Sequence, residues 1–246
     1  MALKATNQDQ RRLLTLQDVD TRIVRLQGKL KALPQTKRID ELDTELATLD
    51  RSVLERLGGH DDIAAEVARI ENDVQTVAAR LTRNRERLPA ITDAKVATAT
   101  EHEIATLERR QGDLEDLELE AMQRQEDAGT ALATAREDAA KARAERERLA
   151  AERDAEAAGL EQELVQARAE RSDRIAGVPA DLLALYDRQR ERYGIGATLL
   201  QHRTSSASGV EFTSSELHEI RQAAEDDVLI DPNSSAILVR TEESGI

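Results

Sequence analysis

The chain has 246 residues, of which 34% are charged and only 1% are aromatic. Aromatic side chains supply much of the buried area of globular cores, and the three present here (Tyr186, Tyr193 and Phe212) lie in the last quarter. This composition is typical of long helices that bury one apolar stripe, and it excludes a large globular core.

The formal net charge of −14 repels nucleic acid at long range, which argues against a dedicated DNA-binding protein. Cysteine is absent, so no disulfide is expected. The first residues lack the apolar core of a signal peptide, and no stretch approaches the roughly 20 apolar residues of a membrane span. We therefore expect a soluble, cytoplasmic protein that does not bind membranes.

The first predicted helix starts near Thr6 or Asn7, since either side chain can cap it. Its apolar residues recur every three or four positions, at Leu16, Val19, Ile23, Leu26, Leu30 and Leu33. Pro34 should end this helix because proline lacks the backbone donor and clashes with the preceding turn. A kink or short break is expected over residues 34–38.

A longer heptad pattern comes next and predicts a coiled-coil helix. Its apolar positions are Ile39, Leu42, Leu46, Leu49, Val53, Ile63, Val67, Ile70, Val74, Val77, Leu81 and Leu88. Gly58 and Gly59 are a weak point, costing about 2 kcal/mol relative to alanine, although the long seam could hold the helix together there.

A second helical arm is predicted from about Thr100 to Arg174, with a seam rich in alanine. Its seam positions are Ile104, Leu107, Leu114, Ala121, Ala128, Leu132, Ala135, Ala139, Ala142, Leu149, Leu160 and Ala167. The two arms have nearly equal lengths and flank a turn near 89–99, so we predict an antiparallel coiled-coil hairpin over residues 1–177. The alternative is a parallel dimer of a longer rod. The short turn at the midpoint favours the hairpin, and with it a monomer.

Residues 178–246 are predicted to form a small α+β module. A helix should begin around Pro179, and Gly194 and Gly196 should end it before a strand over Ala197–Leu200. A second short strand is expected over Val210–Phe212. A capping box, Thr213 to Glu216, opens a short helix over Ser215–Ala223. Val228–Ile230 and Ile237–Val239 flank a hairpin-turn signal.

The order of these segments resembles the bacterial coiled-coil hairpin proteins that end in a four-cysteine zinc ribbon. The resemblance rests on Leu-Leu-Ala-Leu-Tyr (182–186), Gly-Ile-Gly-Ala (194–197) and Ile-Leu-Val-Arg-Thr-Glu-Glu-Ser-Gly (237–245). Residues 95–104, ending in Glu-His-Glu-Ile, also resemble the stretch after the family's turn. It implies a mainly α fold, in which a long antiparallel coiled-coil helical hairpin carries a small zinc-ribbon-like module.

Placed on this chain, the family's four cysteine ligands fall on Ser205, Ser208, Asp231 and Ser234. Thiolates hold structural zinc because they are soft, charged donors, and serine hydroxyls are neutral and hard. We therefore predict a degenerate ribbon without metal or other cofactor. Other potential ligands in the tail, His202, His218, Glu211 and Asp231, lack the spacing of a helical metal site, and they are interpreted as solvated surface residues.

One stretch is locally basic: Arg80, Arg83, Arg85 and Arg87 lie at the end of the outgoing arm, offset only by Glu86. The plainer interpretation is a solvated helix end where arginine complements the helix dipole. The functional alternative is a contact for phosphates or for an acidic partner surface. No aromatic residue is nearby to stack bases, which disfavours RNA.

No nucleophile elbow, phosphate loop or dinucleotide turn is present, so no catalytic residues are predicted and an enzyme is not expected. We predict a non-enzymatic adaptor or chaperone-like protein that engages a protein partner through its hairpin and tail, a role that the resemblance also implies. A nucleic-acid-binding module using the basic tip or the tail is the first alternative. A structural spacer that self-associates through its arms is the second.

Overall fold

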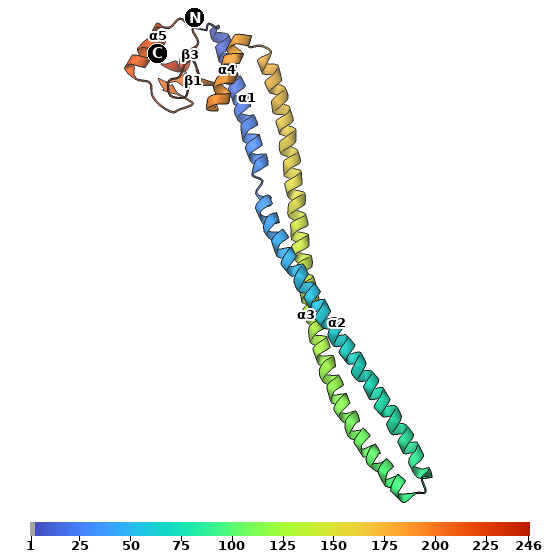
Figure 1. The fold of residues 1–246 in the computed structure, drawn as a ribbon. Helices are drawn as coiled ribbons and strands as arrows, with labels where there is room; N and C mark the ends of the chain where they lie inside the picture. The colour runs from blue at the N-terminus through green and yellow to red at the C-terminus, as the bar shows by residue number, and fades with distance from the viewer. Residues whose placement is uncertain (1–2) are drawn as a thin grey trace. The chain divides into compact units, whose positions relative to one another are not determined.

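The computed structural model describes residues 3–246, which are mainly helical. The elements in chain order are α1 (Asn7–Lys31), α2 (Gln35–Arg87), η1 (Leu88–Ala90), α3 (Ala94–Ile175), α4 (Ala180–Tyr193), β1 (Ala197–Gln201), β2 (Thr204–Ser205), α5 (Ser214–Gln222), β3 (Leu229–Ile230), β4 (Ile237–Val239) and η2 (Glu242–Ser244) (Figure 1). The fold is the predicted one, a long coiled-coil-like helical hairpin with a small C-terminal sheet module.

The contacts divide the chain into two compact units. One consists of the chain up to Pro34 together with Glu152–Ile246, and the other is Gln35–Ala151. This division differs from the predicted boundary at residue 177, because α1 and the end of α3 pack with the C-terminal module. We call the first unit the head and the second unit the hairpin arm.

In the hairpin arm, α2 lies beside α3 in antiparallel orientation (Figure 1). Ion pairs across the two helices show the direction, since Asp43 pairs with Arg146 and Glu66 with Arg124. The buried residues of α3 in this unit are the predicted seam positions Leu114, Ala121, Leu132, Ala135, Ala139 and Ala142. The antiparallel hairpin is thus confirmed, and α2 continues without interruption through Gly58 and Gly59.

The turn is tighter than predicted, because α3 begins at Ala94 instead of near Thr100. Asp93 explains the difference: its Oδ1 accepts hydrogen bonds from the backbone N–H groups of Lys95 and Val96, at 2.8 and 3.2 Å. These bonds satisfy donors that a helix start leaves free, so the helix forms although residues 94–98 lack a periodic apolar pattern.

Other predicted boundaries hold in part. Thr6 caps α1 by accepting from the N–H of Asp9. The break after α1 includes Pro34 as predicted, but it covers residues 32–34 instead of 34–38, because α2 begins directly after the proline, at Gln35. The capping box of Thr213 and Glu216 is formed at the start of α5. The predicted strand over Val210–Phe212 is wrong, because Glu211 makes only an isolated bridge to Thr204 and the cap of α5 comes directly after it.

The head contains a four-stranded sheet in the order β2-β1-β4-β3. β3 and β4 form the predicted antiparallel hairpin, while β4 pairs with β1 in parallel, from Ala197 opposite Ile237 to Leu199 opposite Val239. The residues before α1 pair with the loop after α5, since the Ala5 N–H donates to the Asp226 carbonyl. Both ends of the chain are therefore tied into one module.

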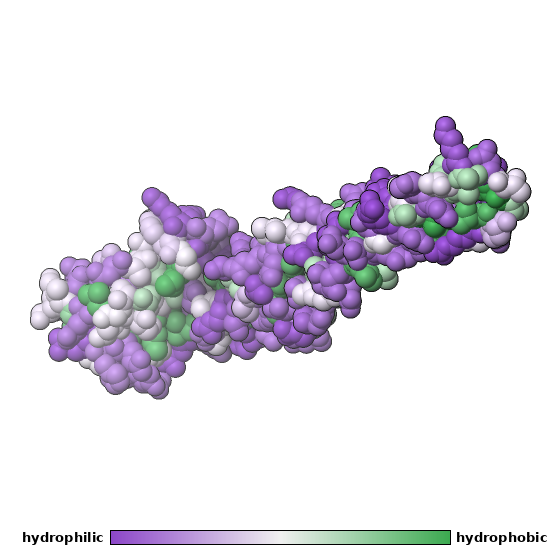
Figure 2. Space-filling model, turned by 90° about the horizontal axis from the view of Figure 1, so that it is seen from below, coloured by the Kyte–Doolittle hydropathy of each residue, from purple (hydrophilic) through white to green (hydrophobic). Residues whose placement is uncertain are grey.

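Three apolar clusters are seen in the described part of the head. The first joins the start of α1 to α4 and the sheet, through Ala5, Leu13, Leu16, Val178, Leu182, Tyr186, Ala197, Ile237 and Val239. The second packs α5 on β1 and β4, through Leu200, Phe212, Leu217, Ile220 and Leu238. The third packs the later part of α1 on the end of α3, through Leu26, Leu160, Leu164 and Ala167. Outside these clusters the surface in view is mostly hydrophilic, with apolar residues in small groups (Figure 2). No helix in the described part of the chain is long and apolar enough to cross a membrane.

Candidate functional site

Only some of the residues that the sequence analysis singled out lie close together in the structure. Ser205 and Asp231 are fully buried, and the Ser205 Oγ donates to the Asp231 Oδ2 at 2.6 Å. The Ser234 hydroxyl donates to the same oxygen, and the Asn233 N–H donates to the other carboxylate oxygen at 2.9 Å. Three of the four predicted ligand positions therefore converge on one carboxylate.

Ser208 does not join them. Its side chain is exposed and accepts a hydrogen bond from the N–H of Val210 in a turn, where Gly209 has a φ of 68°. The cluster is extended on the other side by Thr198, whose hydroxyl lies 3.3 Å from that of Ser205. A buried carboxylate is costly unless it is hydrogen-bonded, and here hydroxyl and backbone donors satisfy it. The cluster ties β2 to the loop between β3 and β4.

The three remaining ligand candidates, His202, His218 and Glu211, do not form a second site. His202 and His218 are exposed, and Glu211 lies near Arg203 instead, at 3.8 Å. Among residues 3–246 no group of three or more histidine and acidic side chains is placed to hold a metal ion.

The basic tip of the hairpin arm is partly neutralised by α3. Arg80 pairs with Glu103 and Arg85 with Glu108, across the two helices. Arg83 donates to the carbonyl of Ala79 on its own helix, and Arg87 borders a shallow depression at the turn. Within the described residues, no ion pair is seen for Arg83 or Arg87. The local positive charge is therefore smaller than the sequence indicates.

A buried network that the sequence did not reveal joins four elements of the head. Asp20 on α1 is only 2% exposed, and its carboxylate accepts from Arg171 of α3 at 2.7 Å and from the Tyr186 hydroxyl of α4 at 2.9 Å. Arg190 of α4 lies 3.4 Å from the same group. Asp187 pairs with Arg171 at 2.7 Å. The network therefore holds two carboxylates and two guanidinium groups, whose charges balance.

The network extends to the sheet through Gln17, one turn before Asp20. The Gln17 Oε1 accepts hydrogen bonds from the backbone N–H of Gly196 at 2.7 Å and of Ala197 at 3.3 Å. Tyr186 packs so closely on Gly196 that a Cβ there would lie 2.5 Å from its ring, so this position requires glycine. One sign of this network is visible in the sequence. Asp20 lies four residues after Leu16, which is buried, and it interrupts an otherwise apolar face of the helix.

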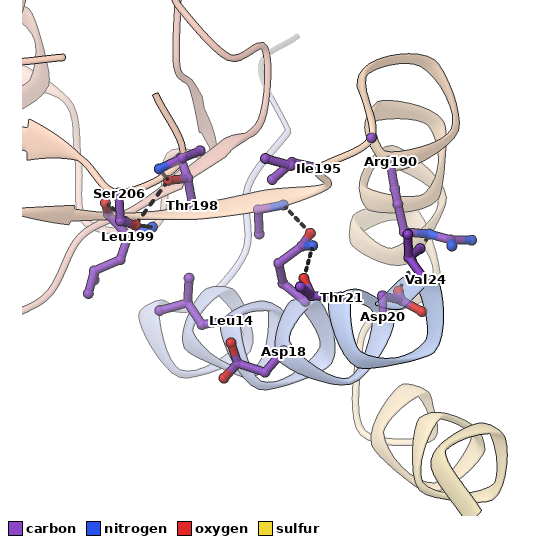
Figure 3. Close-up of a pocket in the computed structure, with 14 residues that line it drawn as sticks. Leu14, Asp18, Asp20, Thr21, Val24, Arg190, Ile195, Thr198, Leu199 and Ser206 are labelled. Carbon is purple, nitrogen blue, oxygen red and sulfur yellow. Dashed lines mark hydrogen bonds and ion pairs between the residues drawn. The ribbon is translucent and has the colours of Figure 1, made fainter. Parts of the chain in front are cut away.

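An open groove lies beside this network, between α1 and the start of β1, with a volume of about 590 Å³ (Figure 3). Leu14 and Val24 of α1 and Ile195 and Leu199 of the strand segment give it an apolar lining. Asp18 lies on the α1 side of the groove and is exposed. No sequence pattern indicated this groove.

The relationship of the chain to known proteins follows from three comparisons. The sequence model of the CT398-like coiled coil hairpin domain matches residues 16–194. The chain belongs to this family. The match spans α1, the hairpin arm and α4, and it ends where Gly194, with a φ of 84°, terminates α4.

Two uncharacterised proteins of Mycobacterium tuberculosis, from strains CDC 1551 / Oshkosh and H37Rv, are each 34% identical over 249 residues, covering 98% of both chains. A solved structure from Mycobacterium smegmatis is 33% identical with a TM-score of 0.80, and the match covers 97% of this chain and 100% of the other. The structure of CT398 from Chlamydia trachomatis shares the fold, with a TM-score of 0.60 at 14% identity, over 95% of this chain and 98% of that one.

Replacement of Asp231 by alanine should destabilise the head by about 2–4 kcal/mol. The substitution leaves the buried Ser205 hydroxyl and the half-buried Ser234 hydroxyl without their acceptor, at a cost of about 1–3 kcal/mol for each unsatisfied group. Chemical denaturation of the full chain measures the change. Asp173→Ala, at an exposed carboxylate of α3, is the matched control and should change stability by less than about 0.5 kcal/mol. Equal effects of the two substitutions would contradict a stabilising role for the cluster.

Replacement of Tyr186 by phenylalanine should cost about 1–2 kcal/mol, because the Asp20 carboxylate loses a donor. Burial, reinforced by Asp20, raises the pKa of Tyr186 above its usual value. A raised pKa means that folding favours the neutral phenol, so this contribution is complete below about pH 10 and is lost as the pH rises further. Unfolding measured against pH should show a steeper alkaline decline for the natural chain than for Tyr186→Phe. Parallel declines would contradict the assignment.

Proposed function

We propose that this protein is a non-enzymatic adaptor or chaperone-like protein, which binds a protein partner through its head and its hairpin arm. The observation that carries the proposal is the groove of the head, whose lining is largely apolar. Concave apolar surfaces of this kind are characteristic of binding sites. The rigid network of Asp20 beside it supports binding, since a preorganised surface loses little entropy on association.

The internal chemistry of the head also favours binding over catalysis. The polar groups nearest the groove are engaged with one another: Gln17 with the backbone of β1, and Asp20 with Arg171, Arg190 and Tyr186. A general acid or base has to reach a substrate proton directly or through one water. These side chains are instead committed to holding α1, α3 and α4 together.

Nucleic-acid binding is the weaker proposal. Phosphate contacts depend on unpaired cations, and two of the four tip arginines are paired with glutamates of α3. The remaining Arg83 and Arg87 belong to a chain of net charge −14. No observation favours self-association through the arms over binding of a different protein.

We further propose that the C-terminal sheet is a zinc-ribbon-like module whose metal site has been replaced by hydrogen bonds. The support is the convergence of Ser205, Asp231 and Ser234, three of the four positions that correspond to cysteine ligands in the zinc ribbons that the tail resembles. Hydroxyl-to-carboxylate bonds then link the segment around Ser205 to the segment around Asp231, the two segments that a metal ion would link. They are weaker than zinc, which supplies on the order of 10 kcal/mol to a small module.

Photo-cross-linking in the native cell tests the adaptor proposal with the full chain. A photoreactive amino acid replaces Thr21 in the groove, Arg83 at the tip or, as the control, Glu161 on an exposed face of α3. We expect a discrete cross-linked protein from Thr21 or Arg83 that is absent from Glu161. Truncation before Val178 is unsuitable, because it would expose Leu13 and Leu16 of α1. Identical patterns at all three positions, or no cross-link, would contradict the proposal.

Restoring the four cysteines tests the ribbon proposal. The variant Ser205→Cys, Ser208→Cys, Asp231→Cys, Ser234→Cys should bind one Co²⁺ per chain with the absorption bands of tetrahedral thiolate coordination, and zinc should compete for the site. The natural chain should show no such bands in the same titration. A matched variant with Ser208 retained removes one ligand and should bind more weakly. Absence of tetrahedral coordination in a folded fourfold variant would argue against the ribbon assignment.

A further inference from the structure

A second concave surface lies on the face of the sheet that α5 covers, whereas the groove lies beside α1. Successive residues of a strand point to opposite faces, so Ile237 and Val239 of β4 pack towards α1 and α4, and Leu238 between them packs towards α5. Between α5 and the hairpin of β3 and β4 is a hollow with a volume of about 320 Å³, which we call the α5 hollow. It shares no lining residue with the groove.

The α5 hollow has an apolar floor and an exposed apolar edge. Its floor is formed by Phe212, Ile220 and Leu238, which belong to the buried cluster beneath α5. At its edge lies Ile230, which is 41% exposed although isoleucine is among the residues most often buried. An apolar side chain placed in the hollow would extend the cluster and cover Ile230, so the burial of apolar area would favour its binding.

The rim of the hollow is acidic. The charged residues that line it are Glu216 and Glu219, both on α5. Glu216 uses its Oε2 to accept from the backbone N–H and from the hydroxyl of Thr213, each at 2.8 Å, and within residues 3–246 no hydrogen bond to its Oε1 is seen. Glu219 is exposed, and in the described part of the chain neither an ion pair nor a side-chain hydrogen bond is seen for it. Both glutamates can therefore receive a donor from a ligand.

The nearby arginines do not neutralise this rim. Arg221 of α5 lines a different depression. The guanidinium of Arg240 donates to the backbone carbonyls of Ile220 and Ala223, at 3.1 and 2.9 Å. The rim thus keeps its negative charge within a chain whose net charge is −14. A cationic ligand is attracted by this field, and an anionic ligand is repelled.

We propose that the α5 hollow binds a short basic segment of a partner protein, which inserts one large apolar side chain between α5 and the hairpin of β3 and β4 and places an adjacent lysine or arginine at Glu219 and Glu216. A nucleic acid or an acidic segment fits less well, because its phosphates or carboxylates would meet the same two glutamates. The inference rests on the adaptor function proposed above, to which it adds a second docking surface and the chemistry of its ligand. An adaptor that joins two partners needs two such surfaces, and the groove and the α5 hollow are formed by different residues.

Selection of short random peptides against the full chain tests the inference. Peptides that place leucine, isoleucine, methionine or phenylalanine next to lysine or arginine should be enriched. Binding of a selected synthetic peptide should weaken about tenfold or more in Ile230→Glu, which puts a charge at the apolar edge, and in Glu219→Lys, which reverses the charge of the rim. Both positions are exposed, and circular dichroism of each variant checks that its fold is retained.

Three control variants separate this surface from the rest of the chain. Val165→Glu and Glu161→Lys make matching changes at exposed positions of α3 and should bind the peptide as the natural chain does. Val24→Glu puts a charge in the groove and should also leave the binding unchanged.

A change of charge in the peptide tests the role of the rim. A peptide with glutamate in place of its basic residue should bind the natural chain about tenfold or more weakly, and it should regain affinity for Glu219→Lys. Failure to enrich any peptide, equal loss in the α3 controls, or loss in Val24→Glu without loss in Ile230→Glu would each overturn the inference. Equal binding of the basic and the glutamate peptide to the natural chain would overturn it as well.

The outcome is separable from that of the adaptor proposal. If cross-linking from Thr21 or Arg83 yields a partner but no peptide binds at the α5 hollow, the adaptor proposal stands and this inference fails. If neither position cross-links to a partner while the peptides bind at the hollow as expected, the hollow is a peptide-binding site and the adaptor proposal fails.

Discussion

The burial of Asp20 is the constraint on which the head depends. A carboxylate that is 2% exposed must be compensated, and the compensation comes from Arg171 of α3 and from Tyr186 and Arg190 of α4. Removal of one partner of such a buried pair costs about 3–5 kcal/mol, far more than a surface ion pair. The arrangement of α1, α3 and α4 is therefore set by charge as well as by apolar packing, and Gln17 extends it to the sheet.

This constraint explains why residues 178–246 pack with α1 in one compact unit instead of forming a separate domain. The sequence suggested a boundary near residue 177, but the apolar core joins Leu13 and Leu16 of α1 to Ile237 and Val239 of β4. A sheet module this small, without cysteines for a disulfide or a thiolate metal site, needs another source of stability. It has two: the hydrogen-bonded cluster around Asp231 within the sheet, and the shared core with the base of the hairpin. The groove lies beside this junction and is formed by both parts.

The heptad spacing, Pro34 and the capping box of Thr213 are local signals, and for this reason the helices, the break after α1 and the start of α5 could be predicted. The antiparallel hairpin followed from equal arm lengths around a short turn. The start of α3 was missed because a single aspartate, Asp93, caps it without any apolar periodicity. The strand at Val210–Phe212 was expected from composition alone, and the adjacent cap of α5 prevents it.

By itself, the sequence determined the helical hairpin, because a repeated apolar spacing along one chain directs a continuous seam to a partner helix. It also determined that the chain holds no cysteine, since residue identity needs no structure. Only the tertiary structure decided which polar residues meet. Ser205 and Asp231, and likewise Asp20 and Arg171, are far apart in the chain, and no periodicity links them. The groove depends on the packing of α1 beside β1, which are far apart in the chain, so it exists only in the folded protein.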